Sequence, residues 1–549
     1  MVISWPDAME DIDYKEKNFK LDLVSLYHPL WMTEGHYIYH LLKDDSGHLC
    51  CQTDQNGEPI CSPRFLTQLS IMKLVCDPSR MRKMKCGDIP SDVFPGLLTE
   101  AILQKELISI EFLVSNWPHT VLDLQLLMPL EDYLRPGYLT QVLGEGNGNM
   151  SLLDCIMMGL LNLKSTSPLK EVNLLGFKND RKLCRELARL PILWMEPKRR
   201  KVQYIHGIVS KTIDISPDRV RRFLNRISSI YSNMDPYIKH GNKIGPIKIR
   251  TNCKVTLDDV PIGLALQQVS PFRFDCTRVW MESIAEIYLP LRNIPLLINS
   301  KCITHLEVEE QNLCNDVFKL TDFLEGLLML TNLDVLSLPN TIHVNIYPEA
   351  PYMLNQVLRS LTRLRKLHLP SCNLRDSLHT MLSGLTKQKT AFECLNLRDC
   401  RLSETDMVFL VHWERLSELR ELNLSRNNLK TVASACVTLL DRMPEITCFS
   451  ISYCCLGAPM IIRIAEKCSE CRFLKAFASQ TFTPLPFIDV QDILEKCAGI
   501  KQLQMCTIVP ETYAFPGAND TQRTENRLHF IESCQVYLRR LGQPDVEVE

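Results

Sequence analysis

The chain has 549 residues, of which 23% are charged and 45% hydrophobic, and its formal net charge is −2. This composition is typical of a globular protein, and the near-neutral charge argues against binding of bulk DNA or RNA, which needs a positive surface. No apolar stretch reaches the ~18 residues of a membrane span, and the acidic N-terminus lacks the apolar segment of a secretory signal. We therefore expect no membrane association, and we expect the 23 cysteines to be free thiols in a reducing compartment.

Residues 62–135 are expected to form a helical region. Its first helix starts with a Ser-Pro pair, since serine caps a helix and proline fits the first turn. Leu66, Ser70 and Leu74 are four residues apart and share one face of this helix, which Leu69 flanks. The small serine between two leucines would let a partner approach the helix closely.

A second row of four-residue spacing follows. Ile89, Val93 and Leu97 are apolar, and Pro90 comes directly after the first of them. On spacing alone, both rows favour a helical cap over a docking site, because apolar residues at helical spacing are usually core and repeat arrays need capped ends.

Residues 136–300 are less regular. Leu169, Val172 and Leu174 form an isolated strand pattern, and residues 245–259 are compatible with an early, atypical strand pair. A basic run follows the middle of this region and suits either a nuclear-import signal or a solvated loop. It consists of Lys198, Arg199, Arg200 and Lys201.

Residues 301–510 repeat an x-x-L-x-L pattern about every 28 residues. Its middle apolar positions are 306, 336, 367, 395, 422, 449, 477 and 503. The pattern predicts an α/β fold, a leucine-rich repeat solenoid of the long type, in a horseshoe with strands on the concave side and helices outside. After one strand, Asn428 is expected to bond backbone groups in the turn, with Cys400 as its equivalent in the preceding repeat. Residues 511–549 are expected to close the array with an amphipathic helix.

Side chains between the inward apolar positions of each strand are expected to be exposed on the concave face. They are the candidates for binding a target protein, although each could equally be a solvated strand position. The six candidates are Glu307, Ser337, His368, Asn396, Asn423 and Ser450.

Motifs for metal binding or catalysis are weak or missing. The cluster between His48 and Cys61 lacks paired Cys-x-x-Cys spacing, and Cys468 and Cys471 have no second pair. The sequence contains no Walker loop, no G-x-S-x-G, no H-E-x-x-H and no kinase signature. We therefore expect no cofactor and no enzymatic activity.

Four segments, in this order along the chain, resemble the PRAME family of leucine-rich repeat proteins. They are "SPRFLTQL", "IPSDVFPGLL", "LVSNWPHTVLDLQLLM" and the C-terminal "IVPETYAFPG" with "NRLHFIESCQVYLRRLGQPDV". The resemblance covers about residues 62–548 and is most specific at its two ends. Residues 1–61 are an N-terminal extension with no recognised counterpart.

Several members of that family are substrate receptors of cullin-RING ubiquitin ligases. The resemblance implies that Leu66, Ser70 and Leu74 form a BC box for elongin C, which acts with elongin B. Phe65 stands where this box often has Ser, Thr or Pro. The cullin box that follows in the family corresponds here to Ile89, Pro90, Val93 and Leu97.

The resemblance thus implies a non-catalytic adaptor that presents an unknown protein substrate to the ligase. It also implies roles in proliferation, differentiation, apoptosis and transcription, in the cytoplasm and nucleus. The alternative is a scaffold or transcriptional corepressor without a ligase. Its motif would be residues 324–328, a Leu-x-x-Leu-Leu segment that some family members use towards nuclear receptors. Its position within a repeat helix favours core packing instead.

Overall fold

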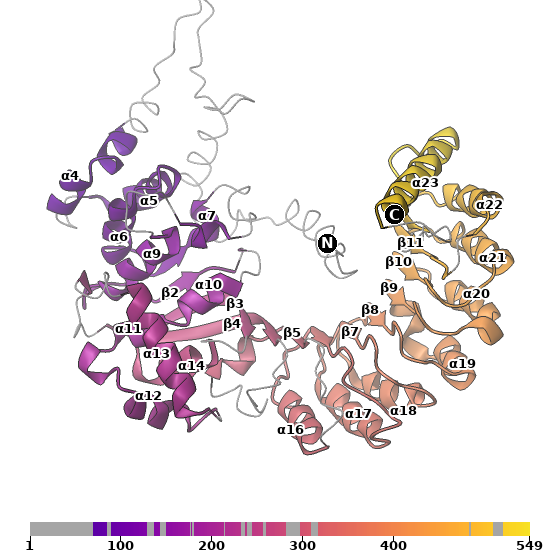
Figure 1. Cartoon of the computed structure of the whole chain (residues 1–549), viewed down its shortest axis with the longest axis horizontal. Helices are drawn as coiled ribbons and strands as arrows, with labels where there is room; N and C mark the ends of the chain where they lie inside the picture. The colour runs from indigo at the N-terminus through magenta and orange to yellow at the C-terminus, as the bar shows by residue number, and fades with distance from the viewer. Residues whose placement is uncertain are drawn as a thin grey trace, which may run out of the picture. The chain divides into compact units, whose positions relative to one another are not determined.

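Short parallel strands, one per repeat, form the sheet around which most of this computed structural model is organised (Figure 1). The structure describes residues 70–84, 89–128, 137–142, 150–175, 177, 181–213, 215–231, 237–238, 244–255, 260–281, 297–308, 317–482, 485–508 and 520–548. The chain divides into two units, residues 1–110 and residues 111–549.

The described part of the first unit is helical. Residues 70–75 end one helix, and the next elements are α4 (Pro78–Lys83), η3 (Ser91–Val93), α5 (Phe94–Leu103) and α6 (Leu107–Ser115), the last of which continues into the second unit. Asp77 separates the first two helices, because its carboxylate accepts a hydrogen bond from the Arg80 N–H at 3.1 Å and Pro78 occupies the first turn of α4.

The core of the first unit is built by apolar residues from each of these helices. Ser109, fully buried on α6, donates its hydroxyl to the carbonyl oxygen of Val75 at 2.8 Å. Its remaining buried apolar side chains are Met81, Ile89, Phe94, Leu97, Leu98, Ala101, Ile102, Leu107 and Ile110. The unit therefore has a core that includes part of both predicted four-residue rows.

The second unit contains one parallel sheet with its strands in chain order. The described strands are β1 (Val121–Asp123), β2 (Glu171–Asn173), β3 (Ile247–Val255), β4 (Phe272–Met281), β5 (His305–Val308), β6 (Val335–Ser337), β7 (Lys366–His368), β8 (Cys394–Asn396), β9 (Glu421–Asn423), β10 (Cys448–Ser450), β11 (Ala476–Ala478), β12 (Met505–Thr507) and β13 (Glu547–Val548).

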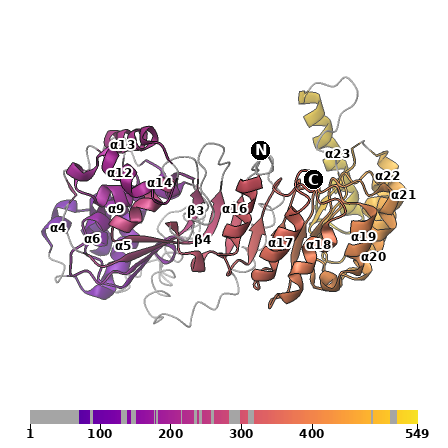
Figure 2. The ribbon, with the colours of Figure 1, turned by 90° about the horizontal axis from the view of Figure 1, so that it is seen from below.

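Helices connect these strands. They are α7 (Leu124–Leu127), α9 (Leu152–Leu161), α10 (Arg181–Leu187), α11 (Leu190–Trp194), α12 (Val202–Val209), α13 (Pro217–Tyr231), α14 (Val260–Leu266), α16 (Val317–Leu327), α17 (Ala350–Ser360), α18 (Leu378–Leu382), α19 (Glu404–His412), α20 (Ala433–Asp441), α21 (Ala458–Cys468), α22 (Phe487–Ala498) and α23 (Asp520–Arg540). Helices α16 to α22 lie side by side along one face of the sheet (Figures 1 and 2). We call the opposite face of the sheet the inner face.

The repeat leucines explain this arrangement. Leu364, Leu367 and Leu369, from one repeat, are each fully buried, and equivalent residues of adjacent strands are in direct register, such as Leu336 with Leu367. No single repeat can enclose its own leucines, so each relies on its neighbours. The predicted α/β leucine-rich repeat solenoid is confirmed.

Buried side chains in the turns after the strands bond one repeat to the preceding one. Each donates to a carbonyl oxygen at the end of the previous strand, at 2.8–3.3 Å. The donors Cys372, Cys400, Asn427 and Cys454 reach the carbonyl oxygens of Leu338, Leu369, Leu397 and Leu424 in that order. We call this series the turn ladder.

The residue before each ladder position has a left-handed backbone. The φ angles of Ser371, Asp399, Arg426 and Tyr453 are 60°, 56°, 61° and 60°. Each of these residues donates its N–H to a carbonyl oxygen of the next repeat at 2.6–2.8 Å. Such angles are costly for residues other than glycine, and they persist because the surrounding hydrogen bonds hold them.

Three details of the sequence prediction were wrong. Asn427, not the exposed Asn428, is the buried turn residue, because it is the one that lies opposite Cys400 in the neighbouring repeat. The last regular strand is centred on Cys506 and not on residue 503, since Leu503 is the first apolar position of its repeat. Residues 247–255 form one strand, β3, rather than a strand pair.

The C-terminal prediction was confirmed in outline. Helix α23 follows the last repeat, and its buried Cys534 and Leu538 face the core. The sequence did not predict β13, which pairs in parallel with β12 through Glu547 and Val548.

One repeat contains a polar residue at a leucine position, and we expect its removal to stabilise the protein. Ser479 follows β11 as Ile451 follows β10, is 1% exposed, and its hydroxyl has no hydrogen-bond partner within the described residues. Ser479→Ala should raise the free energy of unfolding by about 1 kcal/mol, because it removes an unpaired buried hydroxyl. Urea unfolding measures this difference.

A matched control is Ser452→Ala. The Ser452 hydroxyl is also buried, but it accepts the Gln480 N–H at 3.1 Å. This variant should lose about 1 kcal/mol of stability. Equal effects of the two substitutions would contradict the assignment of Ser479 as unpaired.

Candidate protein-interaction surfaces

The segment predicted to bind elongin C is described from Ser70 onwards, and Leu66 and Leu69 lie outside the described residues. Ser70 is exposed and Leu74 is half-buried, whereas Val75 is fully buried. The face of this helix that packs into the first unit therefore includes Val75 and not Ser70. A helix whose Ser70 side faces solvent can accept a partner there.

The segment predicted to bind a cullin is divided between core and surface. Ile89 is 6% and Leu97 is 1% exposed, so these two side chains belong to the core of the first unit. Pro90 is exposed and Val93 is half-buried. Only the latter two can contribute side-chain area to a partner without rearrangement of the core.

The inner face of the second unit differs from its prediction at three of the six candidate positions. Glu307 is exposed, and Ser337 and His368 are half-buried, as expected for a solvated strand face. The other three candidates are buried, with exposures of 6%, 6% and 2% for Asn396, Asn423 and Ser450.

Local hydrogen bonds account for this burial. The side-chain oxygens of Asn396 and Asn423 accept the N–H groups of Arg398 and Ser425, each at 3.0 Å. The Ser450 hydroxyl lies 2.5 Å from that of Ser425. These short polar side chains therefore stabilise the turns after their strands, as Asn and Ser commonly do, and offer little area to a target.

His368 lies in the most polar cluster of the described repeats. Lys366 and Glu421 form an ion pair of 3.0 Å, which spans the intervening strand β8. The His368 Nε2 lies 4.0 Å from the Sγ of Cys394, and its Nδ1 is buried without a partner among the described residues. Burial, aided by Lys366 and opposed by Glu421, lowers the pKa of His368 to about 4. Its ring is therefore neutral at physiological pH.

The basic run of the sequence is exposed at three of its four positions. Lys198, Arg199 and Lys201 face solvent, and Lys198 forms an ion pair of 2.8 Å with Glu196. Arg200 is half-buried and donates to the carbonyl oxygens of Leu193 and Met195 at 2.9 and 3.0 Å. Arg200 thus satisfies free carbonyls after helix α11.

The Leu-x-x-Leu-Leu segment lies in helix α16. Leu324 is 1% and Leu327 is 0% exposed, whereas Leu328 is 39% exposed. Two of its three leucines therefore pack in the core of the solenoid, as the position within the repeat predicted.

Cysteines in the described part of the chain are mostly buried and carry no disulfide. Burial raises the pKa of the Cys400 and Cys468 thiols well above the usual range, so both stay protonated. The His48–Cys61 cluster lies outside the described residues. Among the described residues, no group of three or more His, Cys, Asp and Glu could hold a metal ion. No helix in this part of the chain has both the length and the apolar composition needed to cross a bilayer.

Comparisons with known proteins agree with this architecture. The family model of the PRAME N-terminal domain matches residues 62–147, which contain both predicted docking segments. Leucine-rich repeat-containing protein 14 of Xenopus laevis is 22% identical over 393 residues, which cover 66% of this chain and 71% of that protein. The chain is a PRAME-like leucine-rich repeat protein. A repeat protein of this kind has a protein-binding role.

The buried His368 gives this PRAME-like protein a testable pH response. An unfolded histidine has a pKa of about 6.5, so between pH 7 and pH 5 the unfolded chain gains a proton that the folded chain does not. Stability therefore falls as the pH falls through this range. The His368→Asn variant should lose about 1 kcal/mol less than the wild type between pH 7 and pH 5.

Urea unfolding at the two pH values tests this expectation. The exposed His412 supplies a control, because His412→Asn should lose as much stability as the wild type over the same range. If the His368→Asn variant also loses as much as the wild type, His368 does not titrate below its unfolded range.

Proposed function

We propose that this chain is a non-catalytic substrate-recognition subunit of a cullin-RING ubiquitin ligase. The helix that contains Leu66, Ser70 and Leu74 would bind elongin C, and the segment that contains Pro90 and Val93 would contact the cullin. The repeats would hold a target protein. The ligase would supply all of the chemistry, since the adaptor only brings its target close to the ubiquitin-loaded enzyme.

The observation that carries the proposal is the orientation of the first described helix. Ser70 is exposed although it belongs to an apolar row, and the fully buried Val75 shows that a different face packs into the unit. A row that served only the core would have Ser70 buried with its neighbours. The exposed small residue suits a partner that inserts an apolar side chain beside it, as in helix-in-groove recognition.

The second segment supports a narrower contact. Because Ile89 and Leu97 are buried, a cullin would contact the exposed Pro90 and the accessible part of Val93. The buried pair would instead fix the position of the 3₁₀ turn η3, which lies between them.

The exposed basic residues at 198, 199 and 201 are consistent with nuclear entry in addition to a cytoplasmic location. The burial of Leu324 and Leu327 does not favour the corepressor alternative through the Leu-x-x-Leu-Leu segment. We therefore retain the ligase adaptor as the proposed function.

Coexpression with elongins B and C tests the first contact. The wild-type chain should capture elongin C, and the Leu66→Asp/Ser70→Asp variant should lose most of this capture, because two carboxylates would enter an apolar interface. The readout is the amount of elongin C in a pull-down, with folding checked by circular dichroism.

A control variant changes two exposed residues of the neighbouring helix α4. Arg80→Asp/Lys83→Asp adds as many carboxylates to the same unit and should leave capture unchanged. If the wild type captures no elongin C, or if both variants bind as it does, the proposed ligase role is wrong.

The second contact has its own variant. Pro90→Ala/Val93→Asp should reduce cullin recovery at least ~10-fold, as expected when a charge enters a partly apolar interface. It should leave elongin C recovery unchanged, because Ser70 is unaffected. Equal recovery of cullin by this variant and the wild type would remove residues 90–93 from the interface.

A further inference from the structure

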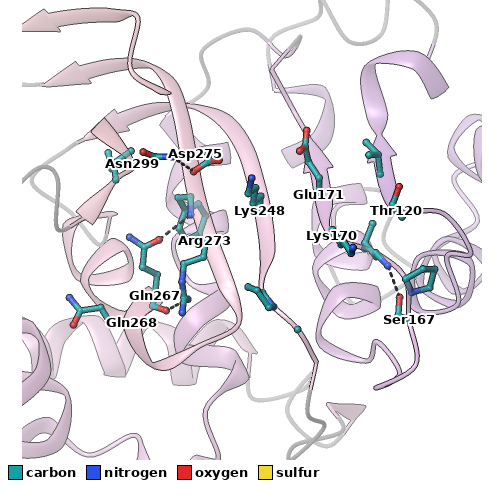
Figure 3. A pocket seen from close by; sticks show the side chains of 17 residues that line it. Thr120, Ser167, Lys170, Glu171, Lys248, Gln267, Gln268, Arg273, Asp275 and Asn299 are labelled. Carbon is teal, nitrogen blue, oxygen red and sulfur yellow. Dashed lines mark hydrogen bonds between the residues drawn. The ribbon is translucent and has the colours of Figure 1, made fainter. Parts of the chain in front are cut away.

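A groove crosses the inner face of the second unit near the beginnings of its first strands (Figure 3). Its volume is about 1110 Å³, and its lining comes from residues before or at the start of β1, β2, β3 and β4 and from the segment before β5. Thr120, Lys170, Lys248, Arg273, Asp275 and Asn299 are among its polar lining residues. None of the sequence motifs pointed to this place, because its residues lie far apart in the chain.

Three cations of this groove lack a carboxylate partner. Within the described residues, the side chains of Lys170 and Lys248 have neither an ion pair nor a hydrogen bond. Arg273 donates to the carbonyl oxygens of Gln267, Ser270 and Phe272 and forms no ion pair with any described carboxylate. The groove therefore has positive charge that the described chain does not neutralise.

The positions of these cations are unfavourable without an anion between them. Lys248 and Arg273 are direct partners in the register of β3 and β4, and like charges in such positions repel. The backbone of Lys170 is equally near, because its carbonyl oxygen accepts the Lys248 N–H at 2.8 Å. A bound carboxylate would relieve this repulsion by lying between two of the cations.

The acidic residues of the groove are already engaged. Glu171 is the partner of Lys248 in the strand register, yet its carboxylate pairs with Arg250 at 3.2 Å. Asp275 accepts a hydrogen bond from Asn299 at 3.3 Å. Figure 3 shows Lys248 between Glu171 on one side and Arg273 on the other. These two fixed carboxylates would repel the closely spaced phosphates of a nucleic acid, whereas an acidic protein segment could place its carboxylates away from them.

The dimensions fit an extended segment. Five adjacent strand positions at ~4.8 Å spacing span ~19 Å, which is the length of about six extended residues. Side chains on one side of such a segment repeat every second residue. Alternating acidic residues could therefore meet the cations in turn.

We propose that this groove binds an extended acidic segment of a partner protein, with Lys170, Lys248 and Arg273 as its charge contacts. The inference deepens the proposed function by giving the chemistry of the bound protein, and it rests on that function only for the later fate of the partner.

Fluorescence anisotropy with a labelled eight-residue peptide of alternating glutamate and alanine tests the groove on the full chain. The wild type should bind this peptide more tightly than the matched glutamine–alanine peptide. Lys170→Glu/Lys248→Glu should raise the dissociation constant at least ~10-fold, because both contacts become repulsive. Lys430→Glu/Lys501→Glu changes the charge equally at exposed sites outside the groove and should stay within ~2-fold.

Three results would overturn the proposal. They are equal affinity for the two peptides, equal loss in the two variants, and tighter binding of a labelled thymidine octanucleotide that the groove variant abolishes. The last result would assign the groove to single-stranded nucleic acid. Lys248→Arg with Lys170 intact should retain binding, which separates loss of charge from loss of folding.

Elongin capture by the same variants separates this proposal from the proposed function. The groove variant should recover elongin C as the wild type does, because its substitutions lie in the second unit. Failure of the wild type to capture elongin C would leave the peptide measurement unaffected. Failure of the peptide to bind would likewise leave the ligase contact standing.

Discussion

Hydrogen bonds from turn side chains to the backbone of the preceding repeat are the interaction on which the solenoid depends. Asn427 illustrates their role, because its amide donates to the Leu397 carbonyl while its oxygen accepts the N–H groups of Cys400 and Leu402. These backbone groups are buried and would otherwise be unsatisfied. The turn ladder thereby holds adjacent turns at one spacing, and this spacing keeps the strands in register.

The register in turn determines which side chains can serve as surfaces. Along the later strands, short polar side chains such as Asn396 bond their own turns and are lost to a partner. The longer strands β3 and β4 instead carry charged residues at facing positions, among them Lys248 and Arg273. The inner face is therefore not a uniform binding surface, and its beginning differs from its end in charge and in accessibility.

The two units support an adaptor that works by position. The first unit has a core of its own from its helices, and this core leaves Ser70 exposed on a helix that also contains the buried Val75. The second unit supplies a parallel sheet with a charged groove. Neither role needs a reactive side chain, which agrees with buried thiols such as Cys400, whose pKa is raised well above the usual range.

The sequence by itself determined the repeat and the identity of its core. The spacing of Leu336, Leu367 and Leu395 predicted parallel strands, because only stacked repeats can bury leucines at that period. It also predicted the buried leucines of the Leu-x-x-Leu-Leu segment from their place in a helix.

Tertiary structure alone decided which polar residues are accessible. The sequence could not show that Asn423 bonds its own turn, nor that residues as distant as Lys170 and Arg273 share a groove. The physical reason is that core positions follow from a period along the chain. The exposure and pairing of a charged or amide side chain depend instead on the neighbours that other strands bring beside it.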